Sequence, residues 1–252
     1  MKNIVMVGNG KWAQNYVATI KNMPINLKIA DRNNWKRLIN EQPDGAIVCT
    51  PPESHIEIAD YCLDKNIPTI IEKPICLNVK DIKYLNKHKT PIIVNYVHLF
   101  SQQYTDVKNS LNELKIKSIY SMGFNKGPFR DYSSLWDYGP HDLSMILDIV
   151  KEDPLAIKIT ENNNLFSINL TFNNIVSNSI VGSGGQYKAR VFDIDCAGLK
   201  INYNGDVLSH HNTPLYNLLD TFLQVIDGKK DSRVGLDLSL KINTILETFN
   251  WS

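Results

Sequence analysis

The first 97 residues alternate short apolar runs with stretches of helical periodicity, and this alternation most constrains the fold. The stretches Lys11 to Ile20 and Ser54 to Lys65 have helical spacing. The runs between them are almost entirely apolar, as expected of strands buried on both faces of a parallel sheet. These runs are Ile4 to Val7, Ile25 to Ala30, Gly45 to Cys49, Thr69 to Ile71 and Pro91 to Asn95. Residues 1–97 are therefore expected to form an α/β domain with a parallel sheet.

The pattern changes after about residue 98. Alternating strand patterning dominates from Ala156 to Leu208. The other expected elements are a strand at Lys117 to Phe124 and helices at Gln102 to Leu114, Trp136 to Val150, Pro214 to Asp227 and Leu236 to Asn250. Residues 98–252 are therefore expected to form an α+β domain with a mainly antiparallel sheet that has one open face.

Charge and cysteine usage exclude several classes of protein. Lys and Arg total 27 against 26 Asp and Glu, and a formal net charge of +1 provides no field that attracts nucleic acid or an anionic membrane. The apolar run near Met1 is too short for a secretory or membrane segment, so a cytoplasmic protein is expected. The 4 cysteines show no CxxC spacing, which favours buried free thiols over disulfides or a metal site.

A glycine-rich loop joins the first apolar run to the first helical stretch. Gly8 permits a tight turn, Gly10 lets a phosphate approach the backbone, and Ala13 allows the helix and strand to pack closely. The helix N-terminus adds free N–H groups and partial positive charge. The loop, with Asn9, Lys11 and Trp12, is therefore predicted to bind the pyrophosphate of a dinucleotide.

An acidic residue follows the second apolar run. Asp31 stands about twenty residues after the glycine loop, where a carboxylate accepts hydrogen bonds from the adenosine ribose hydroxyls. Its charge would repel a ribose 2′-phosphate, which favours NAD. Arg32 is adjacent and could cover that phosphate, so NADP is not excluded. The alternative is a glycine turn followed by an unrelated capping Asp.

The segments Cys-Thr-Pro-Pro-Glu-Ser-His, residues 49–55, and Ile-Ile-Glu-Lys-Pro-Ile, residues 70–75, follow the third and fourth runs. Together with the glycine loop they resemble the Gfo/Idh/MocA oxidoreductase family, and the resemblance extends to Asp137-Tyr-Gly-Pro-His141. It implies a Rossmann domain joined to an antiparallel-sheet domain. It also implies a role for each matching residue. Lys73 is expected beside the nicotinamide and the reacting carbon, Asp137 and His141 on the substrate side, and Thr50, Pro51 and His55 along the cofactor. Two further residues are assigned to the cofactor side from their positions: Asn95 follows the last strand, where its amide could meet the nicotinamide or ribose, and Glu72 is expected to position Lys73 or the backbone.

The residue chemistry supports these assignments separately from the family. Hydride removal from an alcohol carbon requires a base for the hydroxyl proton, and an imidazole titrates near neutral pH. His141 is the best candidate, since Pro140 is well suited to the first turn of a helix and His141 should lie within that turn, with Asp137 just ahead of it and able to orient it. Lys73 stands at the carboxyl end of a strand, where ligands bind in open α/β sheets. The alternatives are a capping Asp–His pair and a solvated lysine.

A loop rich in aromatic residues leads into the Asp137 helix. Tyr132 or Trp136 could stack on a sugar ring, and Arg130 could bind a phosphate or carboxylate with two parallel hydrogen bonds. The alternative is a surface loop with one aromatic anchor. The family usually carries an arginine shortly after Asn95, whereas this chain has His98 and Leu99 in that region.

These residues predict an NAD(P)-dependent oxidoreductase acting on a secondary alcohol or ketone of a sugar, sugar nucleotide or polyol. Two alternatives remain open, an NAD-using glycosidase and a non-catalytic dinucleotide-binding regulator, because fold does not determine function. The open-faced C-terminal sheet predicts a homodimer or homotetramer. No metal, nucleic-acid or membrane partner is expected.

Overall fold

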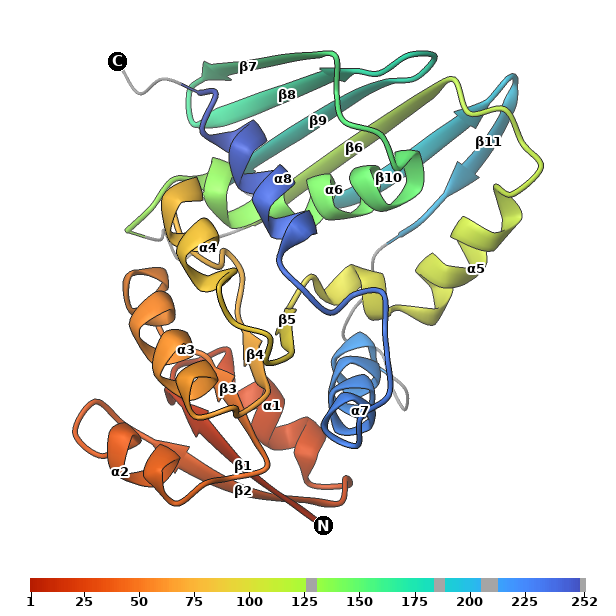
Figure 1. Ribbon diagram of the computed structural model, residues 1–252. Helices are drawn as coiled ribbons and strands as arrows, with labels where there is room; N and C mark the ends of the chain where they lie inside the picture. The colour runs from red at the N-terminus through yellow and green to blue at the C-terminus, as the bar shows by residue number, and fades with distance from the viewer. Residues whose placement is uncertain (126–130, 184–188, 205–212, 250–252) are drawn as a thin grey trace. The chain divides into compact units, whose positions relative to one another are not determined.

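The computed structural model describes residues 1–125, 131–183, 189–204 and 213–249 (Figure 1). The chain divides into two compact units, Met1–Asn95 with His210–Leu240, and Tyr96–Ser209 with Lys241–Ser252. Within the described ranges, no helix is both long and apolar enough to cross a membrane.

The first unit contains a parallel sheet. Its order is β2-β1-β3-β4-β5, and every neighbouring pair is parallel. The strands are β1 (Lys2–Val7), β2 (Ile25–Ala30), β3 (Gly45–Val48), β4 (Thr69–Ile71) and β5 (Ile92–Val94). The order runs outward from β1 in both directions, so the connections reverse between β1 and β3. In open α/β sheets such a reversal creates the crevice in which ligands bind.

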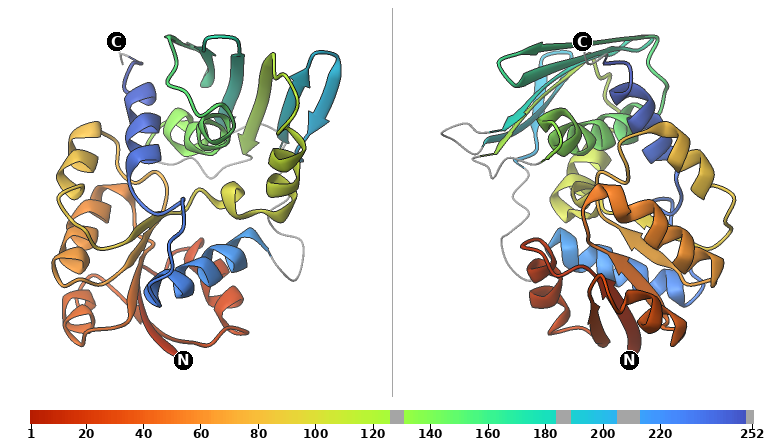
Figure 2. Two further views of the ribbon diagram at one scale, coloured as in Figure 1. Left: turned by 45° about the vertical axis from the view of Figure 1, so that its right-hand side comes forward. Right: turned by 90° about the vertical axis from the view of Figure 1, so that its left-hand side faces the viewer.

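Helices cover both faces of this sheet (Figures 1 and 2). They are α1 (Ala13–Ile20) and α7 (Pro214–Ile226) on one face, and α2 (Trp35–Asn40), α3 (His55–Asp64) and α4 (Val79–Leu85) on the other, with the 3-10 turn η1 (Pro52–Ser54) before α3. The helices α2 and α4 were not predicted from the sequence, because each is barely two turns long. The cap of α4 is Asn78, whose Oδ1 accepts from the Asp81 amide at 2.8 Å.

The helix α7 belongs to the first unit, although it lies in the C-terminal part of the sequence. A side chain at Gly45 would lie 2.8 Å from Phe222 and 2.9 Å from Ile226, so the helix packs directly on β3. The predicted division at residue 97 differs from the observed units at this point. The apolar face of α7 is buried against α1 and β3, and helical periodicity does not indicate which sheet a helix covers.

The second unit contains a sheet of order β11-β10-β6-β9-β8-β7. Only β6 and β9 are parallel neighbours, and the remaining pairs are antiparallel, which confirms the predicted fold class. The strands are β6 (Ser118–Asn125), β7 (Ala156–Asn162), β8 (Leu165–Thr171), β9 (Val176–Ser183), β10 (Ala189–Cys196) and β11 (Leu199–Asn202). The helix α6 (Ser134–Val150) packs on one face, where Gly139 approaches Ile168.

The helix α6 begins earlier than the sequence predicts. Its first residue is Ser134, so Pro140 lies inside the helix rather than in its first turn. The expectation that Pro140 and His141 lie in the first turn of the helix is therefore wrong. A proline at this position removes the hydrogen bond to the carbonyl four residues earlier, that of Trp136. Burial of most of the helix, including Leu135 and Leu143, compensates for this loss.

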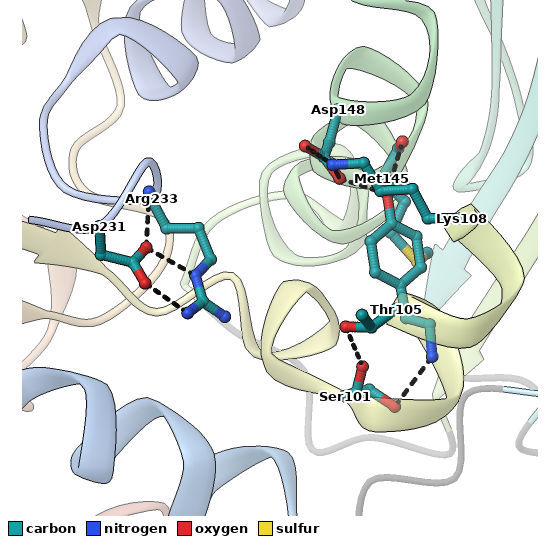
Figure 3. A network of polar contacts seen from close by, with 8 residues as sticks. Ser101, Thr105, Lys108, Met145, Asp148, Asp231 and Arg233 are labelled. Atoms are coloured by element: carbon teal, nitrogen blue, oxygen red, sulfur yellow. Dashed lines mark hydrogen bonds and ion pairs between the residues drawn. The ribbon is translucent and has the colours of Figure 1, made fainter. Parts of the chain in front are cut away.

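A polar clamp attaches α5 (Gln102–Ser110) to α6 (Figure 3). Lys108 Nζ lies 2.7 Å and 2.8 Å from the two carboxylate oxygens of Asp148, and the Tyr104 hydroxyl donates to Asp148 at 2.8 Å. Burial, and then the Asp148 charge, raise the pKa of Tyr104. This part of the unit also includes the 3-10 turn η2 (Val97–Phe100), and α8 (Asp237–Leu246) is the last described helix.

Candidate active site

The carboxyl ends of the five parallel strands carry the residues predicted to bind the cofactor. Gly8 follows β1, Asp31 follows β2, Thr50 follows β3, Lys73 follows β4 and Asn95 follows β5. Because parallel strands end at one edge of the sheet, the structure brings these positions to one side of the first unit. That side includes the reversal between β1 and β3.

The glycine loop passes directly over that reversal. Gly8 has a φ of 110°, and a side chain there would place Cβ 2.2 Å from the carbonyl oxygen of Cys49 and 3.2 Å from Thr50 Cγ2. Apart from the chain neighbours, no described residue has an atom within 4 Å of the corresponding position on Gly10. The backbone conformation therefore requires a glycine at position 8 and leaves open space beside position 10. This arrangement fits a pyrophosphate bound against the N-terminus of α1.

Asp31 makes the capping contacts that the sequence offered as the alternative to ribose binding. Its Oδ1 accepts from the backbone N–H groups of Asn33 at 2.8 Å and Asn34 at 3.1 Å, which organises the turn into α2. Asp31 and the neighbouring Arg32 are exposed. Oδ1 therefore builds the turn, and the exposed carboxylate stays compatible with a hydrogen bond from a ribose hydroxyl.

Glu72 is the centre of a buried polar network. Its Oε1 accepts from Trp12 Nε1 at 2.8 Å, from the Tyr16 hydroxyl at 2.7 Å and from Asn95 Nδ2 at 2.6 Å. Burial is the main cause that raises the pKa of Tyr16, followed by the Glu72 charge. Glu72 and Trp12 are thus directed toward each other beneath the glycine loop. We interpret both as residues that hold the loop rather than as direct cofactor ligands.

One atom of this network has no partner among the described residues. Asn95 Oδ1 is buried and accepts no hydrogen bond there, while Nδ2 of the same amide donates to Glu72 and, at 3.0 Å, to Tyr16. A buried acceptor without a donor is unfavourable. The atom fits an N–H or O–H donor of a bound cofactor.

His55 connects the loops that follow β3 and β4. Its Nε2 lies 2.7 Å from the Thr50 carbonyl oxygen, and its Nδ1 lies 3.0 Å from Pro74 O and 3.2 Å from Ile75 O. Burial lowers the pKa of His55. Because both ring nitrogens face carbonyl oxygens, we interpret His55 as a support for Thr50, Pro51 and Lys73 rather than as a cofactor ligand.

The substrate-side residues lie on α6 in the second unit. Asp137 and His141 are four residues apart, so they share one face of the helix. Asp137 is buried, His141 is half-buried, and the Ser144 hydroxyl donates to the His141 carbonyl at 2.8 Å. Of the predicted aromatic loop, Arg130 lies outside the described residues. Tyr132 is half-buried, and Trp136 is buried in α6.

Sequence reasoning missed a polar cluster beside this helix. Asp142 is fully buried, accepts from the Ser121 hydroxyl at 2.8 Å and pairs with Arg190 of β10. Arg190 also contacts His98. No motif marks these residues, because strand register rather than sequence spacing brings them together.

A second cluster lies away from the glycine loop. Asp60, Asp64 and His88 present ligand-type atoms within 4.8 Å of one another. Asp60 already accepts from Lys87 at 2.9 Å and pairs with His88 at 2.8 Å. These ion pairs account for the arrangement without a metal.

Comparison with protein families supports the interpretation of the first unit. Residues 22–90 match the Gfo/Idh/MocA model, described as an oxidoreductase family with an NAD-binding Rossmann fold. The predicted resemblance to the Gfo/Idh/MocA oxidoreductases is confirmed. The predicted cofactor class, NAD, agrees with the same description. No curated protein matches the chain.

Solved structures share the fold of this protein along nearly the whole chain. A putative oxidoreductase from Magnetospirillum magnetotacticum superposes with a TM-score of 0.84 at 18% identity, over 99% of both chains. The UDP-N-acetylglucosamine 3-dehydrogenase of Acidithiobacillus ferrooxidans gives 0.81 at 13%, over 98% of this chain and 96% of that one. A scyllo-inositol dehydrogenase of Lactobacillus casei, solved with NAD(H) and scyllo-inositol, gives 0.81 at 10%, over 98% and 95%. At these identities the likeness shows the fold.

Proposed function

We propose that this protein is an NAD-dependent oxidoreductase that transfers a hydride between nicotinamide and a secondary alcohol or ketone of a carbohydrate-type substrate. The observation that carries the proposal is the glycine loop at the reversal between β1 and β3. There a Cβ on Gly8 would lie 2.2 Å from the Cys49 carbonyl oxygen, which leaves no room for a side chain, and Gly10 faces open space among the described residues. Lys73 follows β4 at the same edge of the sheet.

The chain's own residues would hold the cofactor in an ordinary dinucleotide arrangement. The backbone from Gly8 to Ala13 and the N-terminus of α1 would bind the pyrophosphate. Asp31 would accept from the adenosine ribose, and the buried Asn95 Oδ1 would accept from a donor on the nicotinamide half. The bound cofactor accepts or supplies the hydride.

Three side chains would control the transfer of the hydroxyl proton. His141 would take the hydroxyl proton as the alcohol is oxidised, or return it during reduction. Asp137, one helical turn before it, would orient the imidazole or a substrate hydroxyl. Lys73 would donate a hydrogen bond to the reacting oxygen, where a developing negative charge is stabilised by an ammonium group.

The substrate class is supported by the chemistry of these groups and by the names of structural neighbours. One neighbour is a UDP-N-acetylglucosamine 3-dehydrogenase and another a scyllo-inositol dehydrogenase. An NAD-using glycosidase would need the same lysine and histidine, but it would release a free sugar without net NADH. Product analysis separates these reactions. A purely regulatory role is disfavoured, because the chain has the three residues that the reaction would need, Lys73, Asp137 and His141.

Thermal unfolding with separate additions of NAD, NADH, NADP and NADPH tests the proposal. A ligand that binds only the folded protein stabilises it by mass action and so raises the melting temperature. At a ligand concentration one hundred times Kd, the free energy of unfolding rises by about 2.7 kcal/mol. A shift with NAD or NADH is expected, followed by a screen of inositols, hexoses and sugar nucleotides for NADH formation. The absence of a shift with all four nucleotides would refute the proposal.

The Asp31→Asn substitution is expected to change nucleotide preference. The amide oxygen can still accept from Asn33 and Asn34, so the turn into α2 is retained, while the charge that repels a 2′-phosphate is lost. We expect Kd for NADH to rise and Kd for NADPH to fall, in titrations followed by nicotinamide fluorescence. Asn33→Ala, in the same turn, is the control. An unchanged NADH to NADPH ratio of Kd would contradict the role of Asp31.

We also propose that the second sheet mediates homodimer or homotetramer formation. The face opposite α6 carries the exposed side chains of Tyr120, Leu165 and Val176, at 38%, 44% and 53% exposure. Exposed apolar groups on an open sheet face are a feature of interfaces. Light scattering should give a dimer or larger, and Leu165→Lys should shift the mass toward the monomer. A wild-type monomer at assay concentrations would refute this proposal.

A further inference from the structure

A buried ion pair joins the helix of His141 to the second sheet. Asp142, the residue after His141, has no exposed surface, and its carboxylate pairs with Arg190 Nη1 and accepts from Ser121 at 2.8 Å. Burial raises the pKa of Asp142, whereas the Arg190 charge and the Ser121 hydroxyl lower it. Because departure of the guanidinium would leave a buried carboxylate unpaired, Arg190 is held in place.

The other terminal nitrogen of Arg190 determines where His98 carries its proton. Arg190 Nη2 lies 3.2 Å from His98 Nε2. A guanidinium has donors and no acceptor, so Nε2 must accept and carries no proton. His98 Nδ1 lies 2.9 Å from the Tyr203 hydroxyl and must hold the ring proton. A proton on Nε2 would place an N–H group against the guanidinium.

The same guanidinium contacts both rings that pack against His141. The centroid of the His141 ring lies 5.1 Å from that of His98, at an interplanar angle of 82°, and 6.2 Å from that of Tyr138. Arg190 Cζ lies 6.0 Å from the Tyr138 centroid. Gly123 provides the space, since a Cβ there would lie 3.0 Å from Tyr138 Cδ1 and 3.4 Å from Arg190 Nη1.

We propose that Arg190 is a positioning residue for the substrate side of the site. It holds His98 in the Nδ1–H tautomer and, through His98 and Tyr138, fixes the orientation of the His141 ring. The consequence for turnover rests on the proposed function, in which His141 moves the proton. The tautomer of His98 is independent of the proposed function, because it follows from the contacts that His98 makes with Arg190 and Tyr203.

The tautomer can be measured directly. In protein labelled with ¹⁵N-histidine, the two ring nitrogens of a neutral imidazole have clearly separate chemical shifts, and His98→Gln assigns the signals. The wild-type spectrum should show an unprotonated Nε2 for His98. Arg190→Lys keeps a charge beside Asp142 but loses the planar fork, so a signal for Nε2–H should appear. The double variant Arg190→Met with Asp142→Asn should show the same change without an unpaired buried charge.

Kinetics then test the link to His141. Both variants should lower kcat by about 10- to 100-fold, the range expected when a reacting group is misplaced, while Kd for NADH stays unchanged. A protonated His98 Nε2 in the wild type, or an unchanged tautomer in both variants, would overturn the proposal. A released tautomer with normal kcat would overturn the positioning of His141. If the wild type shows no oxidoreductase activity, the proposed function fails and the spectra alone decide the role of Arg190 toward His98.

Discussion

Replacing His141 by alanine is expected to lower kcat by roughly 10²- to 10⁴-fold, the range that a positioned general base contributes. Alanine removes the imidazole that would accept the hydroxyl proton at neutral pH, and the Asp137 carboxylate that stays on this face of α6 is a weaker base. Nicotinamide binding should be unaffected, because the glycine loop, Asp31 and Asn95 all lie in the first unit. Steady-state NADH formation with the substrate found by screening gives kcat, and fluorescence titration gives Kd for NADH.

The matched control is His88→Ala. That histidine lies in the first unit and bonds to Asp60 at 2.8 Å, away from the glycine loop. The His88→Ala substitution should change kcat little, although it removes an imidazole just as the His141→Ala substitution does. A His141→Ala protein that turns over at the wild-type rate would refute the assignment of the base.

The Gly8→Ala substitution is expected to abolish measurable NAD binding and to destabilise the protein. The new Cβ would lie 2.2 Å from the Cys49 carbonyl oxygen, and a φ of 110° is strained for any residue with a side chain. Strain of this kind costs of order 1–3 kcal/mol before the overlap is counted. At about 2–4 °C per kcal/mol for a protein of this size, a lower melting temperature should be evident by scanning calorimetry.

Gly10→Ala separates the effect on folding from the effect on the ligand. Apart from the chain neighbours, no described residue has an atom within 4 Å of the added methyl group, so the melting temperature of the nucleotide-free protein should not fall below that of the wild type. Binding of NADH should weaken, because the methyl group would occupy the space that a phosphate needs. Unchanged NADH affinity in both glycine variants would mean that the dinucleotide binds elsewhere.

The first unit was largely predictable because its signals are local. The inner strands β3 and β4 are buried along their whole length, so their runs are apolar, whereas the edge strand β2 carries exposed residues such as Asn26; β2 and β4 both have the predicted bounds. The glycine loop was recognisable because only glycine tolerates the backbone of Gly8. The short helices α2 and α4 were not recognised, since the packing of residues such as Trp35 and Ile82 stabilises them more than their own propensity.

Side-chain roles at the same edge needed the tertiary structure. The sequence indicated that Glu72, His55 and Trp12 belong to the site, but not which way each side chain is directed. In the structure Trp12 donates to Glu72, and His55 bonds to backbone carbonyls, so all three support the loops around the cofactor site. The direction of a side chain depends on the partners that meet it, and these lie up to 60 residues away in sequence.

The sequence by itself determined the two fold classes, the glycine cradle and the helical spacing of Asp137 and His141, because each depends on residues close together in the chain. Only the tertiary structure placed α7 on the parallel sheet and Arg190 against Asp142 and His98. Arg190 and His98 are 92 residues apart. Their contact depends on strand order and register, which are decided by the packing of the whole unit rather than by any local pattern.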